Sequence, residues 1–176
     1  MEHQQRFPTN IFIGDDFINS LEGPEYTDGF IQGMKKHIEK LWAKRDKNKP
    51  NFQTHPFLYN EKEFQPLADL ILKKNLENMK TLKYNVELEN LFMSGMWANI
   101  IAPGEMHRAH THSNNLWSGV YYLYSDQNAG ITFQDPRPAA DVLVPRKLEH
   151  TTENSNLLLY ASKTNRAIIF PSWLMH

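Results

Sequence analysis

The stretch that decides the fold is "LWSGVYYLY" (residues 116–124), a run of apolar and aromatic side chains with one glycine inside it. A short run of this composition predicts a β-strand. Alternate residues of a strand share a face, so Val120, Tyr122 and Tyr124 lie on one side, where aromatic residues are usually part of a core. Gly119 indicates that another backbone passes close by.

The spacing of apolar residues divides the sequence around this run into two parts. Short β-branched or aromatic runs, each bounded by turn-forming residues, predict further strands after residue 88. They are "LENLFMSGMWANIIAP" (88–103), "GITFQD" (130–135), "NLLLYAS" (156–162) and "RAIIFPS" (166–172). Before residue 88, apolar residues recur at three- and four-residue spacing, which predicts amphipathic helices over residues 23–47 and 63–84. Residues 9–17 could add an edge strand, and residues 51–59 read as a loop.

Helices followed by strands predict an α+β fold, with helices packed on one side of an antiparallel sheet system. Five or more short strands in so little chain would close, or nearly close, as a jelly-roll. We therefore expect a single domain over residues 1–176. Residues 1–88 would form a mainly helical supporting part, and residues 89–176 the jelly-roll core, also called a double-stranded β-helix.

Composition narrows the class of protein. Forty per cent of the 176 residues are hydrophobic, which is enough for a core. Nineteen basic residues against twenty acidic ones, with no dense basic stripe, argue against nucleic-acid binding. The absence of cysteine excludes disulfides and thiolate metal sites. We expect a cytoplasmic protein, because no signal peptide and no apolar run of about 20 residues is present.

A histidine cluster, "HRAHTHSN" (107–114), precedes the strand predicted at residues 116–124. His110 and His112 share a face of extended chain and could converge on one metal ion, since neutral imidazole suits Fe, Zn, Cu or Ni. His107, three positions earlier, would lie on the rim. A barrel could bring His176, at the end of "RAIIFPSWLMH", beside the first pair. Surface histidines without a metal remain the alternative.

Five motifs in one order carry a resemblance. They are W-x-N (97–99), H-x-H (110–112), S-G-V-Y-Y (118–122), D-P-R (135–137) and F-P-S-W-L-x-H (170–176), within the segments "WANIIAPGEMHRAHTHSNNLWSGVYYL", "GITFQDPRP" and "AIIFPSWLMH". These segments resemble a family of 2-oxoglutarate/Fe(II)-dependent oxygenases common in marine bacteria and their phages. The resemblance covers roughly residues 90 to 176, and the N-terminal half is similar only through its helices. It implies a jelly-roll whose mouth holds Fe(II), with 2-oxoglutarate as co-substrate. A phage-encoded protein would act in the host cytoplasm.

The resemblance implies His110 as the first iron ligand and His176 as the distal one. The wider, prolyl-hydroxylase-like superfamily usually has a carboxylate at position 112, where this chain has histidine. Two possibilities stay open: an all-histidine set that includes His112, or a carboxylate from elsewhere, with Asp135 as the nearest candidate. We favour His112. No catalytic residue beyond the metal ligands is identified.

Three further residues are candidates for co-substrate binding. By analogy with the superfamily, Tyr122 could donate its hydroxyl to a 2-oxoglutarate carboxylate, although a core role is the ordinary reading. Asn99, the polar member of a strand face with Trp97 and Ile101, could line the pocket. Arg137 could pair with an anion, and a structural pair with Asp135 is an equal alternative.

The sequence thus favours a dioxygenase that hydroxylates a small-molecule or peptidyl substrate, with no nucleic-acid or membrane partner; the oligomeric state is open. Two alternatives are a cupin-like, histidine-only metalloenzyme that does not use 2-oxoglutarate and a non-catalytic metal- or ligand-binding jelly-roll. The family also implies a strand after the distal histidine bearing the arginine that binds 2-oxoglutarate. The sequence given ends at His176, so we expect a fragment of a longer product.

Overall fold

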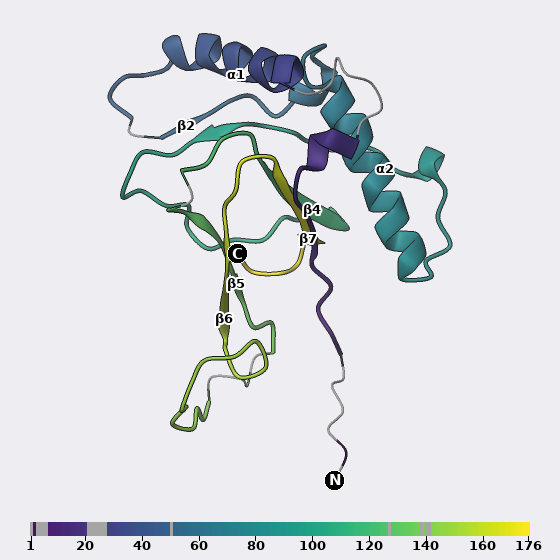
Figure 1. The fold of residues 1–176 in the computed structure, drawn as a ribbon, viewed down its shortest axis with the longest axis vertical. Helices are drawn as coiled ribbons and strands as arrows, with labels where there is room; N and C mark the ends of the chain where they lie inside the picture. Colours follow the sequence, from purple (N-terminus) through teal and green to yellow (C-terminus); the bar gives the residue numbers. More distant parts are fainter. Residues whose placement is uncertain are drawn as a thin grey trace. The chain divides into compact units, whose positions relative to one another are not determined.

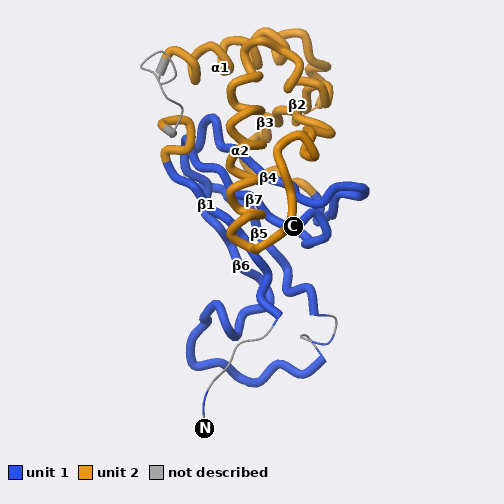
Figure 2. Tube along the Cα trace, turned by 90° about the vertical axis from the view of Figure 1, so that its right-hand side faces the viewer, with its two compact units in different colours: residues 1–15, 108–176 blue, residues 16–107 orange. Residues whose placement is uncertain are grey.

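The structure, a computed structural model, describes residues 2, 7–20, 28–49, 51–126, 128–137, 139 and 142–176. The chain forms two compact units (Figure 2). Unit 1 contains residues 1–15 and 108–176, and unit 2 contains residues 16–107. The N-terminal segment thus groups with the late strands. The single domain and its division near residue 88 into a helical part and a strand core stay predictions.

Unit 1 contains the strands on which the candidate site is built (Figure 1). Their bounds are β1 Phe12–Gly14, β4 Trp117–Tyr122, β5 Gly130–Gln134, β6 Leu157–Ala161 and β7 Arg166–Pro171. One sheet has the order β1-β7-β4, and β5 pairs with β6 in a second; every pairing is antiparallel. The strands predicted at residues 116–124 and 166–172 are thus direct neighbours.

The core of unit 1 lies between these two sheets. Ile168 and Phe170 are alternate residues of β7, so they point to one side, where they contact Phe133 of β5 and Leu174. All four are at most 3% exposed. Val120 and Tyr122 of β4 pack against this cluster, as the alternation in "SGVYY" predicts. Because β7 is the central strand, it reads as a continuous apolar run and is buried along almost its whole length.

Two glycine positions show how closely the strands of unit 1 approach. A Cβ atom added at Gly119 would lie 3.0 Å from the carbonyl oxygen of Ile168 on the neighbouring strand. At Gly130 the added atom would lie 2.3 Å from the carbonyl oxygen of Tyr160. The close approach that Gly119 indicates in the sequence is therefore present, and Gly130 is a second position of this kind.

Unit 2 contains the two helices, α1 (Asp28–Ala43) and α2 (Gln65–Thr81). Its described residues also form short 3-10 helices, η1 (Phe17–Ser20), η3 (Leu58–Asn60) and η4 (Leu88–Asn90), and two short strands, β2 (Phe52–Gln53) and β3 (Asn99–Ile100). Helix α2 has proline in its first turn, where a missing N–H costs nothing. Met34 and Leu67, both apolar positions of the periodic pattern, are buried.

The α+β class and both predicted helices are confirmed. The predicted start of the first helix, residues 23–27, lies outside the described residues. The strand predicted over residues 88–103 is wrong in extent, because its ladder is limited to the two residues of β3, with one isolated bridge between Met96 and Phe57. The partner strand β2 lies in the predicted loop 51–59. Pro56 and Pro103 lie just beyond this short ladder, and proline cannot donate to a ladder. In the part of the chain that the structure describes, no helix is both long and apolar enough to cross a membrane.

Candidate metal centre

The backbone of unit 1 places the histidine segment beside the end of the chain. His110 N–H donates to His176 O (2.9 Å), and His176 N–H donates to His110 O (3.1 Å). This reciprocal pair is the hydrogen-bonded pair of an antiparallel ladder, whose side chains project to the same side. His112 is two residues further along extended chain, and its N–H donates to Ser172 O (3.0 Å). The three side chains therefore converge because of strand geometry.

The three imidazoles of His110, His112 and His176 lie close enough to share one ion. Ring centroids are 4.5 Å apart for His110 and His176, 5.0 Å for His110 and His112, and 5.2 Å for His112 and His176. One nitrogen from each ring lies within 4.8 Å of the others. Ligand atoms of one metal, each at about 2.1 Å from it, lie roughly 3–4 Å apart. A small closure of the rings would bring them to that separation.

Hydrogen bonds fix the tautomer of two of the rings. His110 Nδ1 lies 2.8 Å from Arg108 O, and His176 Nδ1 lies 2.8 Å from Leu174 O. A carbonyl oxygen only accepts, so each Nδ1 carries the proton and each Nε2 carries the lone pair. Histidine ligands of protein metal sites are normally oriented in this way. The donor set therefore fits a metal that prefers neutral imidazole.

The surroundings of the cluster favour neutral rings. Burial lowers the pKa of His112, and the charges of His176 and His110 lower it further. Burial also lowers the pKa of His176, against a hydrogen bond from its ring to the Leu174 carbonyl that raises it. A neutral ring binds a metal without first losing a proton, so the cluster is ready for a cation at neutral pH.

Core aromatic residues support His176 from behind. The Phe170 ring packs edge-on against the His176 ring at 4.6 Å, and Phe133 packs edge-on against Phe170 at 4.8 Å. Ser172, which is fully buried, shares a hydrogen bond with Ser118 (2.7 Å between the oxygens) and accepts from the His112 N–H. The sequence shows Phe170 and Ser172 only as parts of "FPSW"; it does not show that they hold the cluster, because this needs the register of β7 against β4.

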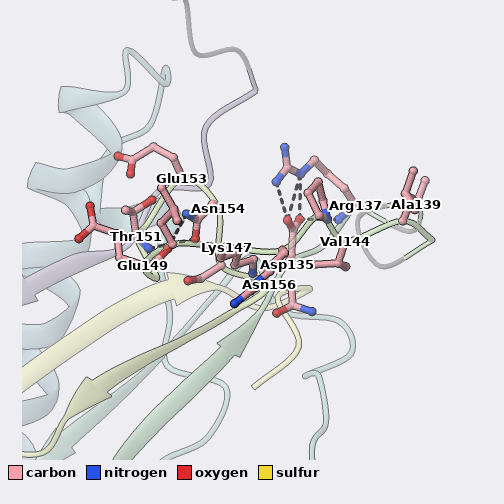
Figure 3. Close-up of a pocket in the computed structure, with 15 residues that line it drawn as sticks. Asp135, Arg137, Ala139, Val144, Lys147, Glu149, Thr151, Glu153, Asn154 and Asn156 are labelled. Carbon is pink, nitrogen blue, oxygen red and sulfur yellow. Dashed lines mark hydrogen bonds and ion pairs between the residues drawn. The ribbon is translucent and has the colours of Figure 1, made fainter.

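Asp135 lies outside the histidine cluster. Arg137 Nε lies 2.9 Å from Asp135 Oδ1, and Arg137 Nη2 lies 2.5 Å from Asp135 Oδ2 (Figure 3). The guanidinium holds the pKa of the Asp135 carboxyl below its usual range. The structural pair between Arg137 and Asp135 is thus formed. The alternative roles, Asp135 as a ligand and Arg137 as an anchor for an anion, stay predictions.

The other two candidates lie in different units. Tyr122 lies on β4 opposite Arg166 of β7 and packs against the core of unit 1. Burial raises its pKa to about 12, and the charge of Arg166 opposes this rise. Asn99 lies on β3 of unit 2, opposite Gln53, and its side chain is exposed. A part for Tyr122 or Asn99 in binding a co-substrate stays a prediction.

A pocket opens in unit 1 where β5 continues into the connection to β6 (Figure 3). Gln134, the last residue of β5, donates its N–H to Met175 O (3.0 Å), so this end of β5 lies beside the chain that carries His176. The pocket begins at the next residue, Asp135, and is lined by apolar residues such as Leu143 and Leu148 and by charged ones such as Lys147. The sequence alone did not predict it, because a long connection has no periodic pattern.

Comparison with known proteins concerns the C-terminal part of the chain. Residues 95–176 match the family described as "Putative 2OG-Fe(II) oxygenase". The matched range contains the three histidines, the β4 and β7 strands and the pocket lining. No curated protein matches the chain. The match confirms the resemblance carried by the five motifs.

Proposed function

We propose that this protein is an Fe(II)- and 2-oxoglutarate-dependent dioxygenase that hydroxylates a small-molecule or peptidyl substrate. The proposal rests on the match of residues 95–176 to the 2OG-Fe(II) oxygenase family. The observation that supports this most strongly is the convergence of the imidazoles of His110, His112 and His176 in unit 1. The family supports an oxidoreductase that uses Fe(II) and 2-oxoglutarate. The jelly-roll is part of the proposal, supported by two antiparallel sheets that face each other across one core.

The proposed iron ligands are His110, His112 and His176. Two of them hold Nδ1–H against a backbone carbonyl, which leaves Nε2 to bind the metal. Fe(II) held by these residues would supply the O₂ chemistry by which 2-oxoglutarate is decarboxylated and a substrate C–H bond is hydroxylated. Three protein ligands on one side of an ion leave positions open for the small molecules of the reaction.

Tyr122 is the proposed donor to the co-substrate. Its pKa of about 12 keeps the phenol protonated at neutral pH, so the hydroxyl can donate a hydrogen bond to a carboxylate. Arg137 could bind an anion only if its side chain left Asp135. Its side chain is 73% exposed, so it has room to do so. The pocket that starts at Asp135 is the proposed place of the substrate, because it adjoins the chain segment bearing His176.

An anaerobic titration with Fe(II), with and without 2-oxoglutarate, tests the proposal. We expect Fe(II) to bind and a visible charge-transfer band to appear only when 2-oxoglutarate is added. Fe(II) binding without any effect of 2-oxoglutarate would favour the second candidate, a cupin-like metalloenzyme. The all-histidine donor set is the observation that favours this candidate. No binding at all would refute both and leave a non-catalytic role.

A further inference from the structure

Unit 2 holds a second group of potential metal ligands, which precedes the matched residues in the sequence. His37 lies on α1, and Glu61 and Glu63 lie between η3 and the start of α2. One ligand atom from each of the three lies within 4.8 Å of the others. The family match begins at residue 95, so neither the match nor the proposed oxygenase assigns a role to this group.

The contact between His37 and Glu61 is unusual for a simple ion pair. His37 Nε2 lies 2.6 Å from Glu61 Oε2, yet within the described residues this buried nitrogen has no hydrogen-bond partner of acceptable geometry. An ion bound by both atoms would satisfy this nitrogen, provided that the two atoms move apart to the roughly 3 Å that separates two ligand atoms of one cation.

His55 holds the Glu61 carboxylate from the other side. The N–H of Phe57 donates to His55 Nδ1 (3.2 Å), so in the neutral ring the proton is on Nε2. That Nε2–H lies 2.9 Å from Glu61 Oε1 and can donate to it. His55 is therefore a positioning residue. It occupies one carboxylate oxygen and leaves Oε2 on the His37 side, as outer partners of metal ligands do.

A ring contact and backbone hydrogen bonds hold His37 and Glu61 in place. The buried Phe64 ring packs edge-on against the His37 ring, with the centroids 5.6 Å apart. The N–H of Glu61 donates to Leu58 O (2.9 Å), and the N–H of Phe64 donates to Glu61 O (2.8 Å). Glu63 Oε1 lies 3.6 Å from Nδ1, the other ring nitrogen of His37, and its 46%-exposed side chain would have to turn toward Nε2 to share an ion with Glu61. One ligand is thus partly open to solvent, which gives an ion a route of entry.

We propose that His37, Glu61 and Glu63 bind a divalent first-row transition cation, with Zn²⁺ or Mn²⁺ as the chemical class. Two carboxylates balance the charge of the ion, and one imidazole favours these metals over Ca²⁺ or Mg²⁺. Ligands at about 2.1 Å lie roughly 3 Å or more apart, so Nε2 of His37 and Oε2 of Glu61 would separate slightly on binding. The ion would tie α1 to the segment that begins α2.

The experiment uses the full chain with the other cluster removed. In a His110→Ala/His112→Ala/His176→Ala background, treated with a chelator and dialysed, Zn²⁺ is titrated by isothermal calorimetry, and unfolding is followed with and without Zn²⁺. We expect one equivalent of Zn²⁺ to bind and the melting temperature to rise, since binding to the folded state stabilises it. No bound equivalent in this folded background would overturn the proposal and leave an ion-pair network.

Two further substitutions separate a metal site from such a network. Adding Glu63→Gln should weaken Zn²⁺ binding at least tenfold, because it removes a ligand from a partly exposed position. Glu77→Gln is the matched control: Glu77 pairs with Lys74 on α2 and should leave binding unchanged. Equal affinity in the Glu63→Gln and Glu77→Gln proteins would refute the assignment. Failure of this site would leave the proposed oxygenase untouched, since the wild-type Fe(II) titration tests that separately.

Discussion

Replacement of His112 tests which residue completes the set of iron ligands. The three rings lie 4.5–5.2 Å apart between centroids. His112 is half-buried, and its backbone N–H donates to Ser172 O. In His112→Ala the backbone hydrogen bond can remain, so His110 and His176 keep their reciprocal pairing. Only one ligand is lost.

The expected loss of Fe(II) affinity in His112→Ala follows from the role of His112 as a direct ligand. Removing an outer partner of a ligand costs 10- to 100-fold in metal affinity, so the loss of a direct ligand should exceed about 100-fold. That corresponds to about 2.7 kcal/mol of binding free energy. Asp135→Asn is the matched control, because Asp135 is bound by Arg137 and lies outside the cluster. We expect its affinity to stay within about threefold of wild type, or roughly 0.7 kcal/mol.

Anaerobic calorimetry with Fe(II) on the three proteins measures this difference, and circular dichroism shows whether each is folded. His112→Asp adds a second comparison, since a carboxylate can replace the imidazole as a ligand, and it should restore much of the affinity. If the Asp135→Asn variant loses Fe(II) binding while the His112→Ala variant keeps it, the all-histidine set is refuted and Asp135 is the third ligand.

Three further predictions concern stability. Phe170→Ala should lower the free energy of unfolding by about 3–5 kcal/mol in urea titrations, because the 2%-exposed ring fills the core; a loss under 1 kcal/mol would contradict this. Gly130→Ala should lower the free energy of unfolding by about 1–3 kcal/mol, because its Cβ would meet a backbone carbonyl. Gly33→Ala on α1 meets open space and should raise it by up to about 1 kcal/mol. Equal effects of the two substitutions would show that β5 and β6 do not approach closely at Gly130. The pKa values of His112 and His176 are lowered on folding, so their contribution to apo stability is complete above the unfolded value of about 6.5 and is lost as pH falls through the folded values. Melting temperatures between pH 8 and 5 measure this loss, which should disappear when both are replaced by Asn.

The strands and helices were predictable where the local apolar pattern matches the side chains that are buried in the folded chain. Residues 116–124 alternate, and β4 forms there with Val120 and Tyr122 facing the core. Residues 63–84 carry helical periodicity, and α2 forms inside that range. Residues 88–103 are apolar as well, yet they are mostly not paired. Apolar composition alone does not specify a hydrogen-bonding partner, and β3 finds one over two residues only.

The sequence by itself determined the class of the fold and the identity of the three histidines, because periodicity, motif order and donor chemistry are properties of the chain. Tertiary structure alone decided that the backbone of His176 hydrogen-bonds to that of His110 and that the Arg137 side chain forms an ion pair with Asp135. It also brought His37 beside Glu61 and Glu63, residues that share no motif. These facts depend on which segments lie side by side, and that is set by the register of β7 against β4 in unit 1 and by packing within unit 2. Contacts between residues far apart in sequence leave no local signal, so only the folded chain reveals them.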